Sequence, residues 1–152
     1  MSIDDRLAEL GLTLPEAAAP VAAYVPAVEA GGLLYLSGQL PFREGKVVTG
    51  RCGEDADLEI ARDAAERCGL MVLAQIRAAL GSLDRVERIV RLGVFVSSAP
   101  TFTDQPKVAN GASELMQAVF GGAGKHARSA VGVPVLPLHA LVEVDAVVAV
   151  RG

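Results

Sequence analysis

The chain has 152 residues, a formal net charge of −4 and a composition that is 51% hydrophobic, with four Phe, two Tyr and no Trp. This length suits one domain, so we assign residues 1–152 to a single domain. The acidic balance, the absence of a Lys/Arg cluster and the sparse aromatic residues argue against nucleic-acid binding.

No stretch of the sequence approaches the roughly 18 uninterrupted apolar residues that a membrane helix needs. The N-terminus is acidic and lacks the apolar segment of a signal peptide, and the two cysteines form no close pair motif, so we expect a cytoplasmic protein. The surplus of apolar residues is then best placed in a subunit interface.

The first third of the chain predicts a short amphipathic helix at residues 3–10, ended by Gly11, and then two strands. The strands are expected at residues 22–29 and 33–37, because Gly31-Gly32 between them is a hairpin turn signal. The pair Glu44-Gly45 predicts a further turn.

Two long helices follow. Residues 54–80 carry the strongest periodic pattern, with acidic residues at the start and Gly81 at the end. Their apolar stripe consists of Leu58, Ala61, Ala65, Cys68, Val72, Ile76 and Ala79. Asp104 is expected to begin the second helix, with Pro106 tolerated in its first turn and Gly121-Gly122 at its end. Its stripe consists of Val108, Ala112, Leu115, Met116 and Val119.

Three more strands are predicted, at residues 86–96, 128–133 and 141–150, from their β-branched and alternating apolar residues. In the first of them Val90, Leu92, Val94 and Val96 are expected to share one face. The order ββαβαββ predicts an α+β fold with one sheet and both long helices on one face. The opposite face would still carry apolar side chains, so we expect a second subunit to cover it.

The segment Gly121 to Lys125 looks at first like a phosphate-binding loop, but His126 follows the lysine where Ser or Thr is needed. The glycines also follow a helix instead of preceding one, which favours a helix end. His126 and His139 are the two histidines of the chain, and no residues at ligand spacing make a metal site with them. We expect both to be exposed loop histidines.

Two charged residues invite a functional interpretation. Arg128 precedes an apolar strand, so it is either an ordinary surface residue or a forked cation that binds a carboxylate in bidentate fashion. Glu143 lies in an apolar strand with Asp145 on the same face. That pattern is typical of a solvated face, but it also fits a carboxylate that faces a cleft and acts as an acid or base.

Four blocks of the sequence, in order, resemble the RidA/YjgF family, also called the L-PSP endoribonuclease family. They are Ala-Tyr-Val-Pro at 23–26, Leu-Ser-Gly-Gln-Leu-Pro at 36–41, Val-Phe-Val at 94–96 with Asn110 after it, and a last block from Ala127-Arg128-Ser129 through Leu136-Pro137 to Val142-Glu143-Val144-Asp145-Ala146. The resemblance runs from about Tyr24 to Val150.

This resemblance implies a chorismate-mutase-like fold and a homotrimer with clefts between its subunits. It also implies that Arg128 holds a substrate carboxylate and that Tyr24, Ser37, Asn110 and Glu143 line the same cleft. The activity implied is hydrolysis of enamine or imine intermediates to 2-oxo acids and ammonia, with no metal or organic cofactor. Glu143 would activate the water, and backbone groups near Gly38 or Ser129 would polarise the imine.

The sequence departs from the family pattern at four places, one of which is the segment around residues 48–63, longer than in the compact members. Ala130 stands where the family has Cys, His126 stands where many members have Pro, and residues 1–15 are an extension. Two other functions fit the same residues: a non-catalytic or chaperone-like protein that binds a small carboxylate, and, against the charge argument, an endoribonuclease.

Overall fold

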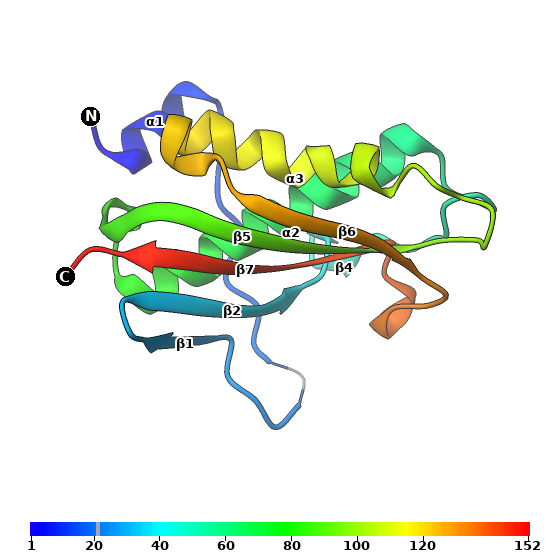
Figure 1. Ribbon diagram of the computed structural model, residues 1–152, viewed down its shortest axis with the longest axis horizontal. Coiled ribbons are helices and arrows are strands. Elements are labelled where there is room, and N and C mark those ends of the chain that lie inside the picture. The colour runs from blue at the N-terminus through cyan, green and yellow to red at the C-terminus, as the bar shows by residue number, and fades with distance from the viewer. Residues whose placement is uncertain (21) are drawn as a thin grey trace.

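Five strands form the central sheet of the computed structural model, which describes residues 1–20 and 22–152 (Figure 1). The strands are β1 (Ala27–Ala30), β2 (Leu33–Gln39), β5 (Val86–Ser97), β6 (Ala127–Val133) and β7 (Val142–Val150). Their order in the sheet is β1-β2-β7-β5-β6. The pair β5 and β6 is parallel and the other neighbouring pairs of this sheet are antiparallel. β6 is therefore an edge strand.

The two long helices, α2 (Leu58–Leu80) and α3 (Gln105–Phe120), cover one face of this sheet (Figure 1). Their predicted apolar stripes are buried except Leu58, which is half-buried, and Ala79, which is exposed. The helices approach each other closely at Gly69, where an added Cβ would lie 2.8 Å from Leu115 Cδ2. Gly111 lies against the backbone carbonyl of Arg62 in the same way. The predicted α+β architecture, with both helices on one face, is confirmed.

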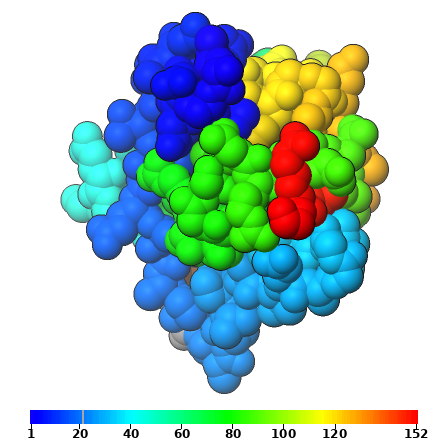
Figure 2. Space-filling view, turned by 90° about the vertical axis from the view of Figure 1, so that its left-hand side faces the viewer, coloured from blue at the N-terminus to red at the C-terminus, as the bar shows by residue number. Residues whose placement is uncertain are grey.

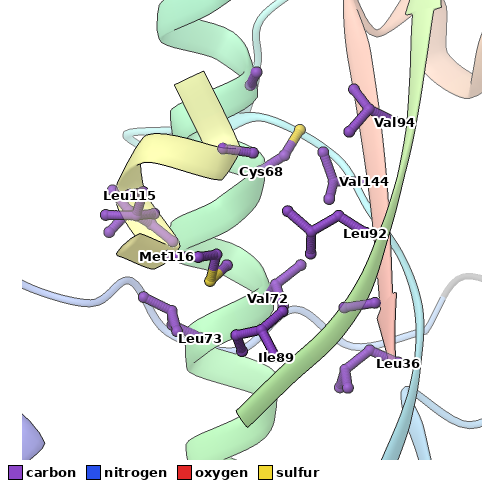
Figure 3. Packing of buried hydrophobic residues seen from close by; sticks show 14 of the residues in the cluster. Leu36, Cys68, Val72, Leu73, Ile89, Leu92, Val94, Leu115, Met116 and Val144 are labelled. Atoms are coloured by element: carbon purple, nitrogen blue, oxygen red, sulfur yellow. The ribbon is translucent and has the colours of Figure 1, made fainter. Parts of the chain in front are cut away.

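The core lies between this helix layer and the sheet. Figure 3 shows Cys68 and Val72 of α2 and Met116 of α3 facing Leu92 of β5 and Val144 of β7. These side chains are fully buried, at 0% exposure. Burial of such apolar side chains contributes about 1.5–3 kcal/mol each relative to leaving them in water, so this cluster stabilises the packing of the helices on the sheet.

The helix ends follow local chemistry. The Asp57 side chain accepts a hydrogen bond of 2.9 Å from the Ile60 N–H, so α2 begins there and not at residue 54 as predicted. Glu54 and Asp55 instead lie in a preceding turn, where Asp55 accepts from the Arg51 N–H at 2.7 Å. Gly81 ends α2 with a left-handed φ of 82°. Gly121, with a φ of 62°, ends α3, as predicted.

Two strand predictions were wrong in part. The strand expected at residues 22–29 begins at Ala27, because Pro26 has no N–H to donate to a ladder. In β5, Ile89 takes the core position expected for Val90, since the register with β7 shifts between Ile89 and Arg91. The turn at Glu44-Gly45 is present and joins two short strands that were not predicted, β3 (Phe42–Arg43) and β4 (Lys46–Val47).

The N-terminal extension packs against the rest of the domain. Its helix α1 (Ile3–Glu9) buries Leu7 to 4% exposure, and the connector buries Leu14. The Arg6 Nε donates to the Ala118 carbonyl of α3 at 2.9 Å. Figure 2 shows this N-terminal segment beside the chain near residue 120. Among the described residues, no helix is both long enough and apolar enough to cross a membrane.

Candidate functional site

Arg128 lies in β6 opposite Leu92 of β5, whose side chain is buried under the helices. The Arg128 side chain therefore starts on the helix side of the sheet and reaches α3. Its guanidinium NH1 donates to Asn110 Oδ1 at 2.9 Å and to Ser113 Oγ at 3.0 Å. Its NH2 donates to the Pro106 carbonyl at 3.3 Å. The head group is thus held by three acceptors.

All three acceptors of Arg128 are neutral. Within the described part of the chain, Arg128 makes no ion pair, whereas several other arginines each pair with a carboxylate, namely Arg6, Arg43, Arg51, Arg62, Arg77, Arg85 and Arg91. A guanidinium carries five N–H donors, and the contacts above leave some of them free. An oriented, uncompensated cation of this kind suits a carboxylate ligand.

One cavity lies apart from Arg128, at the C-terminal ends of β5 and β6. It has a volume of about 420 Å³ and is lined by Arg51, Glu54, Ser98, Phe102, Gln105 and Gly132, among others. Arg51 in this cavity already pairs with Glu54 at 3.1 Å. Arg51 thus has a carboxylate partner, whereas Arg128 has none among the described residues.

Glu143 occupies the opposite face of the sheet. It alternates along β7 with Val142 and Val144, which are fully buried under the helices. Burial raises the pKa of the Glu143 carboxyl above its ordinary value, and the nearby charge of Asp145 raises it further. Burial also raises the pKa of Asp145, while Arg91 and the Gly93 N–H oppose that change. A carboxyl with a raised pKa is suited to proton transfer near neutral pH.

Of the other predicted residues, Gly38 contacts Glu143, and Ser37 and Tyr24 lie near Gly38. Gly38 lies directly against the Glu143 carboxylate, because a Cβ at position 38 would collide with it. The neighbouring Ser37 donates its hydroxyl to the Val25 carbonyl at 2.7 Å. Tyr24, which is 45% exposed, lines a small pocket together with Gly38.

The structure therefore divides the predicted residues into two groups. Arg128 and Asn110 lie together on the helix side of the sheet, and Glu143 and Gly38 lie together on the open face. Ser129, the neighbour of Arg128 in β6, is exposed and points to the open face, as strand alternation requires. Within one chain these two groups do not meet.

Two residues near Arg128 were not recognised from the sequence. His126 was expected to be exposed, but it is half-buried, with its Nε2 2.9 Å from Ser113 Oγ and its Nδ1 2.6 Å from the Gly124 carbonyl oxygen. Ser113 is three residues after Asn110, a spacing that places both on one face of a helix. That spacing is the signal that would have found Ser113. His139 is exposed, as predicted.

Comparisons with known proteins agree on the relationship. The family model described as "YjgF/chorismate_mutase-like, putative endoribonuclease" matches residues 4–149. Protein TCP17 of Trypanosoma cruzi is 52% identical over 145 residues, covering 94% of this chain and 91% of that protein. The 2-iminobutanoate/2-iminopropanoate deaminase of Dermatophagoides farinae is 30% identical over 142 residues, covering 92% and 95%.

Solved structures add the same fold. Atu1372 of Agrobacterium tumefaciens, a protein of unknown function, superposes with a TM-score of 0.91 at 50% identity, covering 98% of this chain and 92% of that one. TdcF of E. coli, solved with bound serine, gives a TM-score of 0.62 at 26% identity, covering 90% and 94%. A relative of this chain thus binds a small amino acid. The chain itself belongs to the YjgF/chorismate-mutase-like, or RidA/YjgF, family.

Proposed function

We propose that this protein hydrolyses 2-imino acids to 2-oxo acids and ammonia, with the substrate carboxylate bound by Arg128. The observation that carries this proposal is the Arg128 guanidinium, which three neutral acceptors orient and which has no ion pair within the described residues. The deaminase name of the mite relative and the serine bound to TdcF support the same class of ligand.

The chemistry needs one water and one group that moves a proton. Glu143 takes a proton from water as the oxygen attacks the imine carbon and gives that proton to the nitrogen, which yields a tetrahedral amino alcohol. The same carboxylate then takes the hydroxyl proton of the amino alcohol and passes it to the nitrogen, so the C–N bond breaks as the C=O bond forms, and ammonia and the 2-oxo acid leave. The raised pKa of Glu143 favours both transfers near neutral pH. Backbone groups near Gly38 or Ser129 are the proposed partners of the imine nitrogen.

A complete site requires a second copy of the chain, because Arg128 and Glu143 lie on opposite faces of the sheet. We place the site between subunits of a homotrimer, with Arg128 at the β6 edge of one subunit facing the open sheet face of the next. That open face carries exposed apolar side chains from three strands: Val28 at 51%, Tyr35 at 47% and Val131 at 47% exposure. A face of this kind favours self-association.

The test is hydrolysis of imines generated from several amino acids by an amino-acid oxidase, with semicarbazide capturing the imine that remains. Arg128→Ala should lower kcat/KM by about 10- to 150-fold, since a charge-assisted hydrogen bond contributes about 1.5–3 kcal/mol. Arg128→Lys should recover only part of this, because the fork is lost.

Arg88→Ala is the matched control. Arg88 also donates to a backbone carbonyl, that of Lys125 at 2.6 Å, and makes no ion pair within the described residues. The control should keep the wild-type rate. If Arg128→Ala behaves like this control, Arg128 has no part in the reaction.

The same assay distinguishes the proposed enzyme from the alternative, a protein that binds the carboxylate without turnover. A protein that binds 2-oxobutanoate through Arg128 but accelerates none of the imines would be a carboxylate-binding protein. Ribonuclease activity, which the family description names, is disfavoured by the net charge of −4.

A further inference from the structure

A chain of hydrogen bonds connects Arg128 to a histidine that the proposed reaction does not use. Arg128 NH1 donates to Ser113 Oγ at 3.0 Å, and Ser113 Oγ lies 2.9 Å from His126 Nε2. His126 Nδ1 in turn lies 2.6 Å from the Gly124 carbonyl oxygen. These hydrogen bonds therefore link three parts of the fold: β6, α3 and the turn that precedes β6.

The direction of each bond follows from its partners. A carbonyl oxygen only accepts, so the Nδ1 of His126 carries the proton, and Nε2 of the neutral ring is an acceptor. Ser113 then donates its hydroxyl hydrogen to Nε2, which leaves its oxygen lone pairs to accept from Arg128. Arg128 can only donate. With these directions, every donor in the hydrogen-bond series faces an acceptor.

We infer that Ser113 and His126 are positioning residues that fix the Arg128 head group for the substrate carboxylate; this inference rests on the proposed function. An arginine side chain has many rotamers, and it binds a carboxylate most tightly when its forked guanidinium is already oriented. Ser113 is only 6% exposed, so its hydroxyl is removed from water and depends on His126 for its orientation. The histidine therefore acts on substrate through Ser113 and Arg128.

The same pair has the polarity of a serine nucleophile and its base. Two observations favour positioning. The Ser113 hydroxyl is almost fully buried, and its oxygen already accepts from Arg128, so it is not presented to an electrophile.

The test compares Ser113→Ala, His126→Leu and His126→Gln in imine hydrolysis. The first two should raise KM about three- to tenfold, the scale of one hydrogen bond, and change kcat less than about twofold. The amide of His126→Gln reaches close to the position of Nε2 and offers an acceptor oxygen, so it should restore a KM near wild type. His139→Gln, at the exposed histidine, is the matched control and should change neither constant.

Calorimetric titration with 2-oxobutanoate gives a second measurement that does not depend on the fraction of active protein. Its Kd should rise in Ser113→Ala and His126→Leu in parallel with KM. If Arg128→Ala leaves KM and Kd unchanged, the proposed function itself is wrong. If Arg128→Ala raises both but Ser113→Ala and His126→Leu do not, only the positioning role is wrong. A loss confined to kcat in Ser113→Ala would instead indicate a nucleophile and would overturn it.

Discussion

Replacing Gly38 by alanine is expected to disable the protein through Glu143. A Cβ built at position 38 collides with the outer oxygen of the Glu143 carboxylate and lies 2.8 Å from its Cδ and 3.0 Å from its Cγ. Comfortable carbon contacts are about 3.5–4.0 Å, so the carboxyl must move by roughly 1 Å. A misplacement of about 1 Å at a reacting group costs on the order of 100-fold in rate. We therefore expect kcat for imine hydrolysis to fall about 100-fold.

The fold should tolerate this change, since Glu143 is half-exposed and can turn toward solvent. The thermal unfolding midpoint of Gly38→Ala should stay close to that of the wild type. Gly122→Ala is the matched control, because an added Cβ there meets no atom of the described residues within 4 Å and its backbone is not left-handed. It should keep full activity.

A double-mutant cycle isolates the cause of the loss. In a Glu143→Ala background no carboxylate remains for the new methyl group to displace, so Gly38→Ala should have no further effect on the residual rate. An equal loss in both backgrounds, or wild-type kcat in the single Gly38→Ala variant, would refute the reasoning.

Other predictions concern pH, packing and assembly. Since the Asp145 charge raises the pKa of Glu143, Asp145→Asn should lower that pKa and move the acidic limb of the kcat–pH profile to lower pH. Gly111→Ala should destabilise the fold by about 1–3 kcal/mol in urea unfolding, because its Cβ would press on the Arg62 carbonyl between α2 and α3. Val131→Glu should place a charge on the open face and dissociate the proposed homotrimer, as measured by light scattering; an unchanged mass would place the interface elsewhere.

The sequence predicted the helix layer well because each helix carries its own period. The stripe from Val108 to Val119 is buried as expected, since an amphipathic helix is defined by residues near one another in the chain. Which residues of a strand face the core depends on the register with the neighbouring strands, and the sequence of one strand does not reveal that register. Ile89 replaced Val90 in the core because the ladder with β7 shifts there.

The sequence predicted individual residues of the candidate site but not the contacts between them. Glu143 and Gly38 are far apart in sequence, yet their contact follows from the pairing of β2 with β7, which the alternating apolar pattern does not specify. His126 was misjudged because its partners, Ser113 and the Gly124 carbonyl, come from a helix and a turn. Its residue type gave no indication of burial.

Because Arg128 and Glu143 lie on opposite faces of the sheet, two variants that each lack one of these residues are expected to complement each other. Arg128→Ala and Glu143→Ala proteins, each much slower than the wild type alone, would regain part of the lost turnover when unfolded and refolded together. In a 1:1 mixture about a quarter of the intersubunit sites would combine an intact arginine with an intact glutamate, since each is present in half of the chains. Activity would then require two adjacent subunits of an assembly, and dilution to single chains would abolish it reversibly.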